Sequence, residues 1–205
     1  MKKFIRTGLL PLALVFPLLG EDCEKSVDIA VSVATEIPFQ INSNNATYSE
    51  VDTVDFTGDI KNALADAQVN ETSIVDIKIE SVTYTVTNYN GAPNTLASGL
   101  LRVGPIDSNN ASDVKLLSQL KDVDLSAIAG QEEVLALNSP GVAFLHAKLK
   151  DAIISNAGVV KAFIDGQVNP APPSNLDFPL TAKVNLIVVV REKVEVPGGC
   201  SNPVE

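Results

Sequence analysis

The stretch FPLTAKVNLIVVVREKVEV, from Phe178 to Val196, decides the fold class. Its even-numbered positions are apolar throughout, with Glu192 as the one exception. An alternation with a period of two is typical of a β-strand with one buried face. Ile187 and Val189 add apolar side chains to the other face, which predicts a central strand covered on both sides, with nearby helices as the cover. At about 3.3 Å per residue the strand would span on the order of 60 Å, so we expect it to bend or to belong to a long sheet.

Five earlier stretches show the same alternation. In the first, Pro38 cannot donate a backbone hydrogen bond, which predicts an edge strand or a bulge. In the third, the apolar parity changes between Ile79 and Val82, which predicts a bulge near Glu80 and Ser81. The turn sequence 88–91 (NYNG) predicts that the third and fourth strands form a hairpin. The predicted strands are 27–41, 48–56, 73–89, 95–103 and 159–168.

Helical patterns fall mainly between the fourth and fifth of these strands. The predicted helical segments are Ile60–Ala67 with Asp59 as N-cap, Asp113–Leu120 with Ser112 as N-cap, Glu132–Leu137, and a helix whose stripe is Val142, Leu145, Leu149 and Ile153. The sequence therefore predicts an α+β fold. We expect a long antiparallel, sandwich-like β-sheet, with helices inserted between strands four and five and packing on one face.

The first twenty residues have the pattern of a secretory signal. A basic start is followed by the apolar run Gly8–Leu19, which is shorter than the roughly 20 residues that span a bilayer. Pro11 and Pro17 argue against a buried helix of the domain. We therefore expect residues 1–20 to be a signal peptide and residues 21–205 to form a single exported β-rich domain, located in the periplasm, on the outer surface or secreted.

The two cysteines lie on either side of the predicted strands. If the first and last strands are antiparallel neighbours, Cys23 and Cys200 lie at the same end of the sheet, and export permits a disulfide between them. The alternative is lipidation of Cys23, although Glu21 and Asp22 fit that signal poorly. We expect a protein that is not integral to the membrane and that carries a membrane anchor only if Cys23 is lipidated.

Composition argues against nucleic-acid binding and against most enzyme chemistries. The net charge is −10, and no basic patch offsets it. The chain has one His and no Trp, and His146 lies at the margin of the apolar helical stripe. The loop Asp107–Asp113 is rich in oxygen ligands, but it lacks the spacing and the glycine of a calcium loop. We interpret it instead as a turn that leads into a helix N-terminus. We expect no catalytic residue, no metal and no cofactor, and therefore no enzyme.

Two classes of function remain. The first is a non-enzymatic interaction or structural module of the bacterial envelope or cell surface, with a protein partner. The second is a periplasmic carrier of a lipid or another apolar ligand, held in a cleft between sheet and helices. The candidate lining residues of that cleft are Val184, Leu186, Ile187, Val188 and Val189. Lipid recovered by organic extraction of the purified protein would favour the carrier.

Overall fold

A computed structural model describes residues 24–43, 46–89, 91–109, 113–155, 157–170 and 176–195. Antiparallel strands dominate this part of the chain, and helices are few. In chain order the elements are β1 Glu24–Ser43, β2 Thr47–Asp55, α1 Phe56–Asp66, a short 3-10 turn Glu71–Ser73, β3 Ile74–Val86, β4 Leu96–Gly104, β5 Lys115–Asp124, α2 Leu125–Ile128, β6 Glu132–Leu135, α3 Ser139–Ser155, β7 Val159–Asn169 and β8 Leu176–Glu195.

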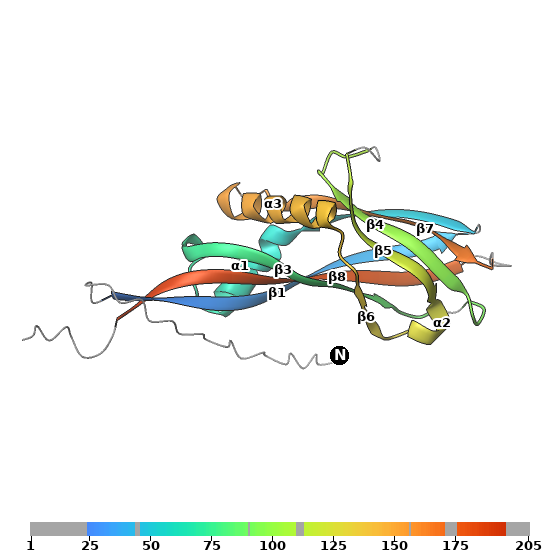
Figure 1. The fold of residues 1–205 in the computed structure, drawn as a ribbon, viewed down its shortest axis with the longest axis horizontal. Coiled ribbons are helices and arrows are strands. Elements are labelled where there is room, and N and C mark those ends of the chain that lie inside the picture. Colours follow the sequence, from blue (N-terminus) through green and yellow to red (C-terminus); the bar gives the residue numbers. More distant parts are fainter. Residues whose placement is uncertain are drawn as a thin grey trace, which may run out of the picture.

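The strands form two four-stranded sheets (Figure 1). One, here called the long sheet, has the order β1-β8-β3-β6, and the other, the short sheet, has the order β2-β7-β4-β5. The pairs β4 with β5, β3 with β6, β2 with β7 and β1 with β8 are nested inside one another along the chain. The chain is thus one long antiparallel double strand whose successive pairs alternate between the sheets, which is the arrangement of an eight-stranded jelly roll.

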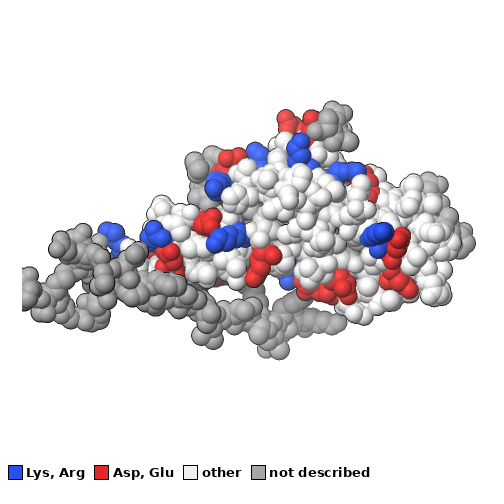
Figure 2. Space-filling model, in the orientation of Figure 1, with Lys and Arg blue, Asp and Glu red and all other residues white. Residues whose placement is uncertain are grey.

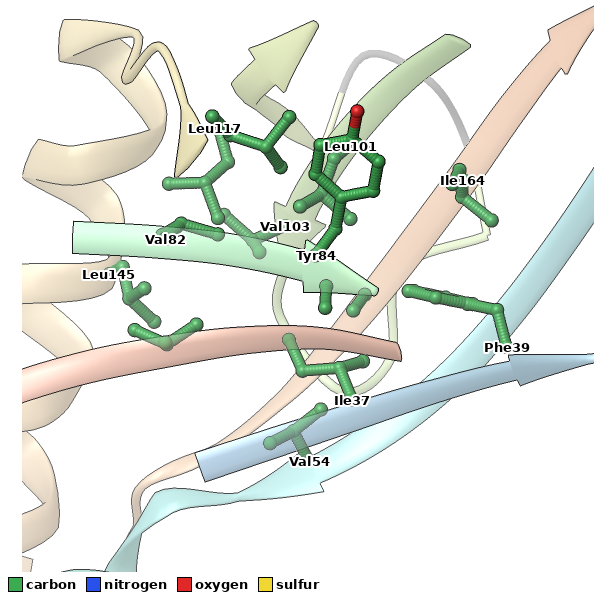
Figure 3. Packing of buried hydrophobic residues seen from close by; sticks show 14 of the residues in the cluster. Ile37, Phe39, Val54, Val82, Tyr84, Leu101, Val103, Leu117, Leu145 and Ile164 are labelled. Carbon is green, nitrogen blue, oxygen red and sulfur yellow. The ribbon is translucent and has the colours of Figure 1, made fainter. Parts of the chain in front are cut away.

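The core lies between the sheets and continues under two helices. Figure 3 shows side chains of both sheets pointing toward one another, among them Phe39 of β1 and Leu101 of β4. Leu145 of α3 joins the same cluster and is fully buried. The long sheet extends beyond the short one, and α1 and α3 lie beside this extension (Figure 1). The helices therefore continue the layer that the short sheet begins.

Several predictions from the alternating pattern are confirmed. The strand β8 has twenty residues and lies between β1 and β3, and Val188 on it is fully buried. The register of β3 against β8 shifts between Ile79 and Ser81, where the change of parity predicted a bulge. Pro38 lies exposed on the edge strand β1. The first and last strands are antiparallel neighbours, and Glu24 pairs with Glu195.

The helical prediction for Asp113–Leu120 is wrong, because most of this segment belongs to β5. Its leucines follow a helical spacing, yet Leu117 and Leu120 are both buried in a strand. The register against β4 skips Leu117, since Ser118 pairs with Leu101 and Leu116 with Arg102. A bulge at Leu117 thus changes which alternate positions of the strand point to the core, so that buried leucines stand three residues apart, as on a helix. The predicted helical piece Glu132–Leu137 is likewise wrong, and most of it forms β6.

The predicted placement of elements needs three further corrections. The sequence predicted a single sheet, whereas the strands form two. The predicted hairpin of the third and fourth strands does not form, because β3 lies in the long sheet and β4 in the short one. The region between the predicted fourth and fifth strands contains β5 and β6 as well as helices, of which only α3 was correctly predicted. The first helix begins at Phe56 rather than Ile60, since Asp55 is its N-cap and accepts a hydrogen bond from the backbone N–H of Thr57 at 2.9 Å.

Candidate interaction surface

The five candidate cleft residues of β8 lie on two opposite faces. Val184, Leu186 and Val188 are fully buried in the core between sheets and helices. Ile187 and Val189 point to the other side and are partly exposed. The prediction that this strand is covered on both sides, with helices as the cover, is wrong for the side of Ile187 and Val189, because α1 and α3 pack on the core side. The five residues therefore do not line one common surface.

The side chains of β1, β8, β3 and β6 that point away from the core form a solvent-facing surface, here called the outer face. Its geometry follows from the ladder, in which every second residue of β1 stands opposite a residue of β8. From β1 the outer face presents Ser26, Asp28, Ala30, Ser32, Ala34, Glu36 and Pro38, all exposed. Their partners on β8 are, in the same order, Lys193, Arg191, Val189, Ile187, Asn185, Lys183 and Thr181.

An ion pair marks one end of the outer face. The Arg191 guanidinium donates two hydrogen bonds to the carboxylate of Asp28, from Nε to Oδ1 at 2.7 Å and from an Nη to Oδ2 at 3.0 Å. The hydrogen bond from Arg191 holds the pKa of Asp28 below its ordinary value of 3.8. The same contact raises the pKa of Arg191. Both side chains are therefore charged and mutually oriented at neutral pH.

A second charged cluster lies about eight residues along β8, on the order of 27 Å away. The Thr83 hydroxyl donates to Oε1 of Glu132 at 2.6 Å, and the Lys183 ammonium lies 3.5 Å from the same oxygen. The hydrogen bond from Thr83 is the main cause that lowers the pKa of Glu132, and the charge of Lys183 adds to it. Glu36 stands opposite Lys183 in the ladder on the β1 side. Both ends of the outer face thus carry paired charges.

The two strands give the outer face two unlike columns of side chains. The β1 column is small in its middle, at Ala30, Ser32 and Ala34, and an acid, Asp28 or Glu36, lies on either side of this middle. The β8 column is larger in its middle, at Ile187 and Val189, and has bases on either side, Arg191 and Lys183. Beyond β3, Val134 of β6 is 73% exposed and stands opposite Thr83. The outer face therefore combines exposed apolar side chains with ordered charges.

Other residues that the sequence singled out have structural roles or lie elsewhere. His146 is partly exposed on α3, at the margin of its buried stripe. In the loop that begins at Asp107, the Lys161 ammonium donates to the carbonyl oxygen of Ser108 at 3.0 Å, so a protein cation already contacts these oxygens. Cys23 and Cys200 lie outside the described residues. Within the described ranges, no group of three or more His, Cys, Asp or Glu side chains could hold a metal ion, and no helix is long and apolar enough to cross a membrane.

The ordered charges of the outer face were missed by reasoning from the sequence. A signal was present, because Asp28 and Glu36 of β1 occupy the polar positions of one alternation, and Lys183 and Arg191 those of another. Only the register between the strands places acid opposite base. That register depends on which strands are neighbours, which local patterns do not specify.

No protein-family model matches the chain, and no curated protein matches it in sequence. Among solved structures, one of turnip yellow mosaic virus at 100 K shares 10% identity with a TM-score of 0.27, over 81% of this chain and 98% of that one. A structure of desmodium yellow mottle tymovirus shares 12% identity with a TM-score of 0.26, over 97% of each chain. With TM-scores this low, the likenesses carry no weight for the fold or the function.

Proposed function

We propose that the protein is an exported, non-enzymatic interaction or structural module of the bacterial envelope or cell surface. The observation that carries the proposal is the outer face, where Ile187 and Val189 stay partly exposed beside ordered charges. Apolar side chains rimmed by charges on a protein surface are typical of binding sites. The backbone of this surface is held in a ladder, so binding requires little ordering of the chain.

Export is supported by the N-terminal pattern and is consistent with the surface charge. Removal of residues 1–20 would take away three basic residues and no acidic one, which leaves 12 basic and 25 acidic residues and a net charge of 12 − 25 = −13. Figure 2 shows acidic and basic side chains interspersed on the visible face rather than gathered into a patch of one sign. A net charge of −13 favours solubility, and it disfavours anionic partners because they would be repelled.

The export proposal is tested by intact mass spectrometry of protein recovered from the periplasm or medium of a bacterial host. The mature chain is expected to begin between Gly20 and Cys23. A recovered chain that keeps Met1–Leu19 contradicts export. A mass increase by one diacylglycerol group on Cys23 would show that this residue carries a lipid anchor and does not form the disulfide.

The interaction proposal is tested by placing a photo-crosslinking amino acid at Ser32, in the middle of the outer face, in cells that make the full chain. The matched control is Thr53, which is exposed on the edge strand of the other sheet. We expect a discrete crosslinked adduct from position 32 and none from position 53. Equal labelling from both positions, or none from position 32, contradicts an interaction through the outer face.

A further inference from the structure

We infer that the outer face binds the outer face of a second copy of this chain, around a two-fold axis that runs parallel to the strands between β1 and β8. This inference rests on the proposed interaction function and names its partner. The axis lies in the plane between the two facing sheets, one from each copy. It places the β1 column of each copy over the β8 column of the other, in the same rows that the ladder defines.

Charge complementarity follows from the two columns. The axis puts Asp28 of one copy opposite the second copy's Arg191, and Glu36 opposite the second copy's Lys183. At one end the interface then holds two acids and two bases in alternation, since every copy keeps its own Asp28–Arg191 pair. At the other end, each Lys183 keeps its own Glu132 and also faces the second copy's Glu36. Packed sheets cross at about 30°, an offset that the long Arg and Lys side chains can span. A network of this kind is stronger than an isolated surface ion pair.

Shape complementarity follows from the middle rows. There Ala30 of one copy lies opposite the second copy's Val189, and Ser32 lies opposite the second copy's Ile187. Small side chains against larger ones let the two sheets interdigitate, as the inner faces of a β-sandwich do. Contact would also remove from water the apolar side chains that α1 and α3 leave uncovered. An arrangement with β8 of one copy over β8 of the other would instead place the basic residues of the two copies opposite one another, which is unfavourable.

The size of the interface predicts weak, reversible association. The rows from Lys193 to Thr181 extend for about 40 Å and the two columns for about 10 Å, so each copy buries on the order of 400 Å². Stable complexes bury roughly 800 Å² per partner. We therefore expect weak association that is detectable only at high protein concentrations. Attachment or crowding at a surface would raise the local concentration toward this range.

The test is sedimentation equilibrium of the mature protein over a concentration series that reaches the millimolar range. The expected result is a monomer–dimer equilibrium for the wild type. Ser32→Asp, which places a carboxylate against the second copy's Ile187, is expected to remove the dimer. Thr53→Asp, with the same change of charge on an exposed strand of the short sheet, is expected to leave it unchanged. A monomer at every concentration, or a dimer that Ser32→Asp does not weaken, overturns the inference.

Charge reversal separates this arrangement from any other dimer. Asp28→Lys alone sets a lysine opposite the second copy's Arg191, and Arg191→Glu alone sets a glutamate opposite the second copy's Asp28. Each single variant is therefore expected to weaken the dimer at least about tenfold. The double variant restores both pairs and is expected to recover wild-type association. A position-32 adduct with a different protein, together with a monomer in solution, would overturn the second copy as partner and leave the interaction proposal standing.

Discussion

Asp28 and Arg191 face each other across β1 and β8, joined by hydrogen bonds of 2.7 and 3.0 Å although 163 residues separate them in the chain. The contact closes the outermost pair of the nested strands, β1 with β8. It therefore reports directly on the register of the long sheet.

Arg191→Gln is expected to raise the pKa of Asp28 toward 3.8, because the hydrogen bond from Arg191 is the main cause of its lowered value. A lowered carboxyl pKa stabilises the fold above the unfolded pKa, and this contribution is lost as the pH falls through the folded value. Carboxyl chemical shifts in an NMR titration of the folded protein measure the change. Asp124, whose pKa is lowered by Ser126 at the start of α2, is the internal control and should not move. An unchanged Asp28 would mean that the pair is not formed in solution.

Val188→Asp is expected to prevent folding or to lower the free energy of unfolding by about 3 kcal/mol or more, because it buries an unpaired charge in the core. Val188 is fully buried, and Arg191, the nearest base in sequence, is exposed on the opposite face. Ser32→Asp on the exposed side of β1 is the matched control and should change stability by less than about 0.5 kcal/mol. Denaturant titration of both variants measures the two changes in the free energy of unfolding. Similar losses would mean that the register of β8 against β1 differs from the ladder described here.

The strands with a regular alternation could be predicted from the sequence. The bulge near Glu80 could be predicted too, because a clear period of two continues on both sides of the change of parity. The segment that contains Leu117 could not, since a bulged strand and a short helix give the same spacing of leucines. The turn at 88–91 signals a change of direction but does not say that the flanking strands pair. Assignment of β3 and β4 to different sheets is a property of the whole nested fold.

The candidate surface shows the same division. The exposed alternation of β1 and the additional apolar residues Ile187 and Val189 were visible in the sequence. Ile187 and Val189 indicated a covered face, whereas the helices cover only the core side of β8 and leave both residues partly exposed. The acid and base columns depend on pairing between segments that are more than 130 residues apart. Long-range register of this kind is not contained in local patterns.

Gly166→Ala is expected to destabilise the fold by about 1–3 kcal/mol through overpacking. A Cβ at Gly166 would lie 2.3 Å from the carbonyl oxygen of Ser98 and 2.3 Å from the ring of Tyr48, and the first of these neighbours is backbone. The comparison is Gly58→Ala in the first turn of α1, where the nearest atom would be 4.0 Å away. Alanine there should stabilise by about 0.5–1 kcal/mol. Thermal unfolding of the two variants should shift in opposite directions.

Tyr48→Phe is expected to extend the stability of the protein to higher pH. Burial is the main cause that raises the pKa of Tyr48 to about 12, and the charge of Asp165 adds to it. Because the folded pKa lies above the ordinary 10.0, the stability linked to this phenol is complete below pH 10 and is lost as the pH rises toward 12. The loss amounts to about 2 kcal/mol, and the variant should not show it. The measurement is the free energy of unfolding between neutral pH and pH 12, in wild type and variant.

At neutral pH the same substitution should have a small effect. The Tyr48 hydroxyl donates one long hydrogen bond, to the carbonyl oxygen of Ser98 at 3.3 Å. Its removal should change stability by less than about 1 kcal/mol. If wild type and variant lose the same free energy of unfolding between pH 10 and pH 12, the assignment of the raised pKa to Tyr48 is contradicted.

Cys23 and Cys200 are expected to form a disulfide. They lie outside the described residues, and the prediction rests on the strands that they flank. Since Glu24 pairs with Glu195, the start of β1 and the end of β8 meet at one end of the long sheet. The enclosed span is 200 − 23 = 177 residues. Closing a loop of this length in the unfolded chain stabilises the fold by roughly 4–5 kcal/mol in the entropic description.

Thiol titration of the exported protein, unfolded without reductant, tests the disulfide directly. No free thiol is expected, and reduction should expose two and lower the midpoint of denaturant unfolding. A Cys23→Ser, Cys200→Ser double variant should unfold at the reduced midpoint and should not respond to reductant, which separates loss of the bridge from side effects of the reducing agent. Two free thiols in the exported chain would rule the bridge out. The ladder and the Asp28–Arg191 contact would then hold the paired ends of β1 and β8 without a covalent link.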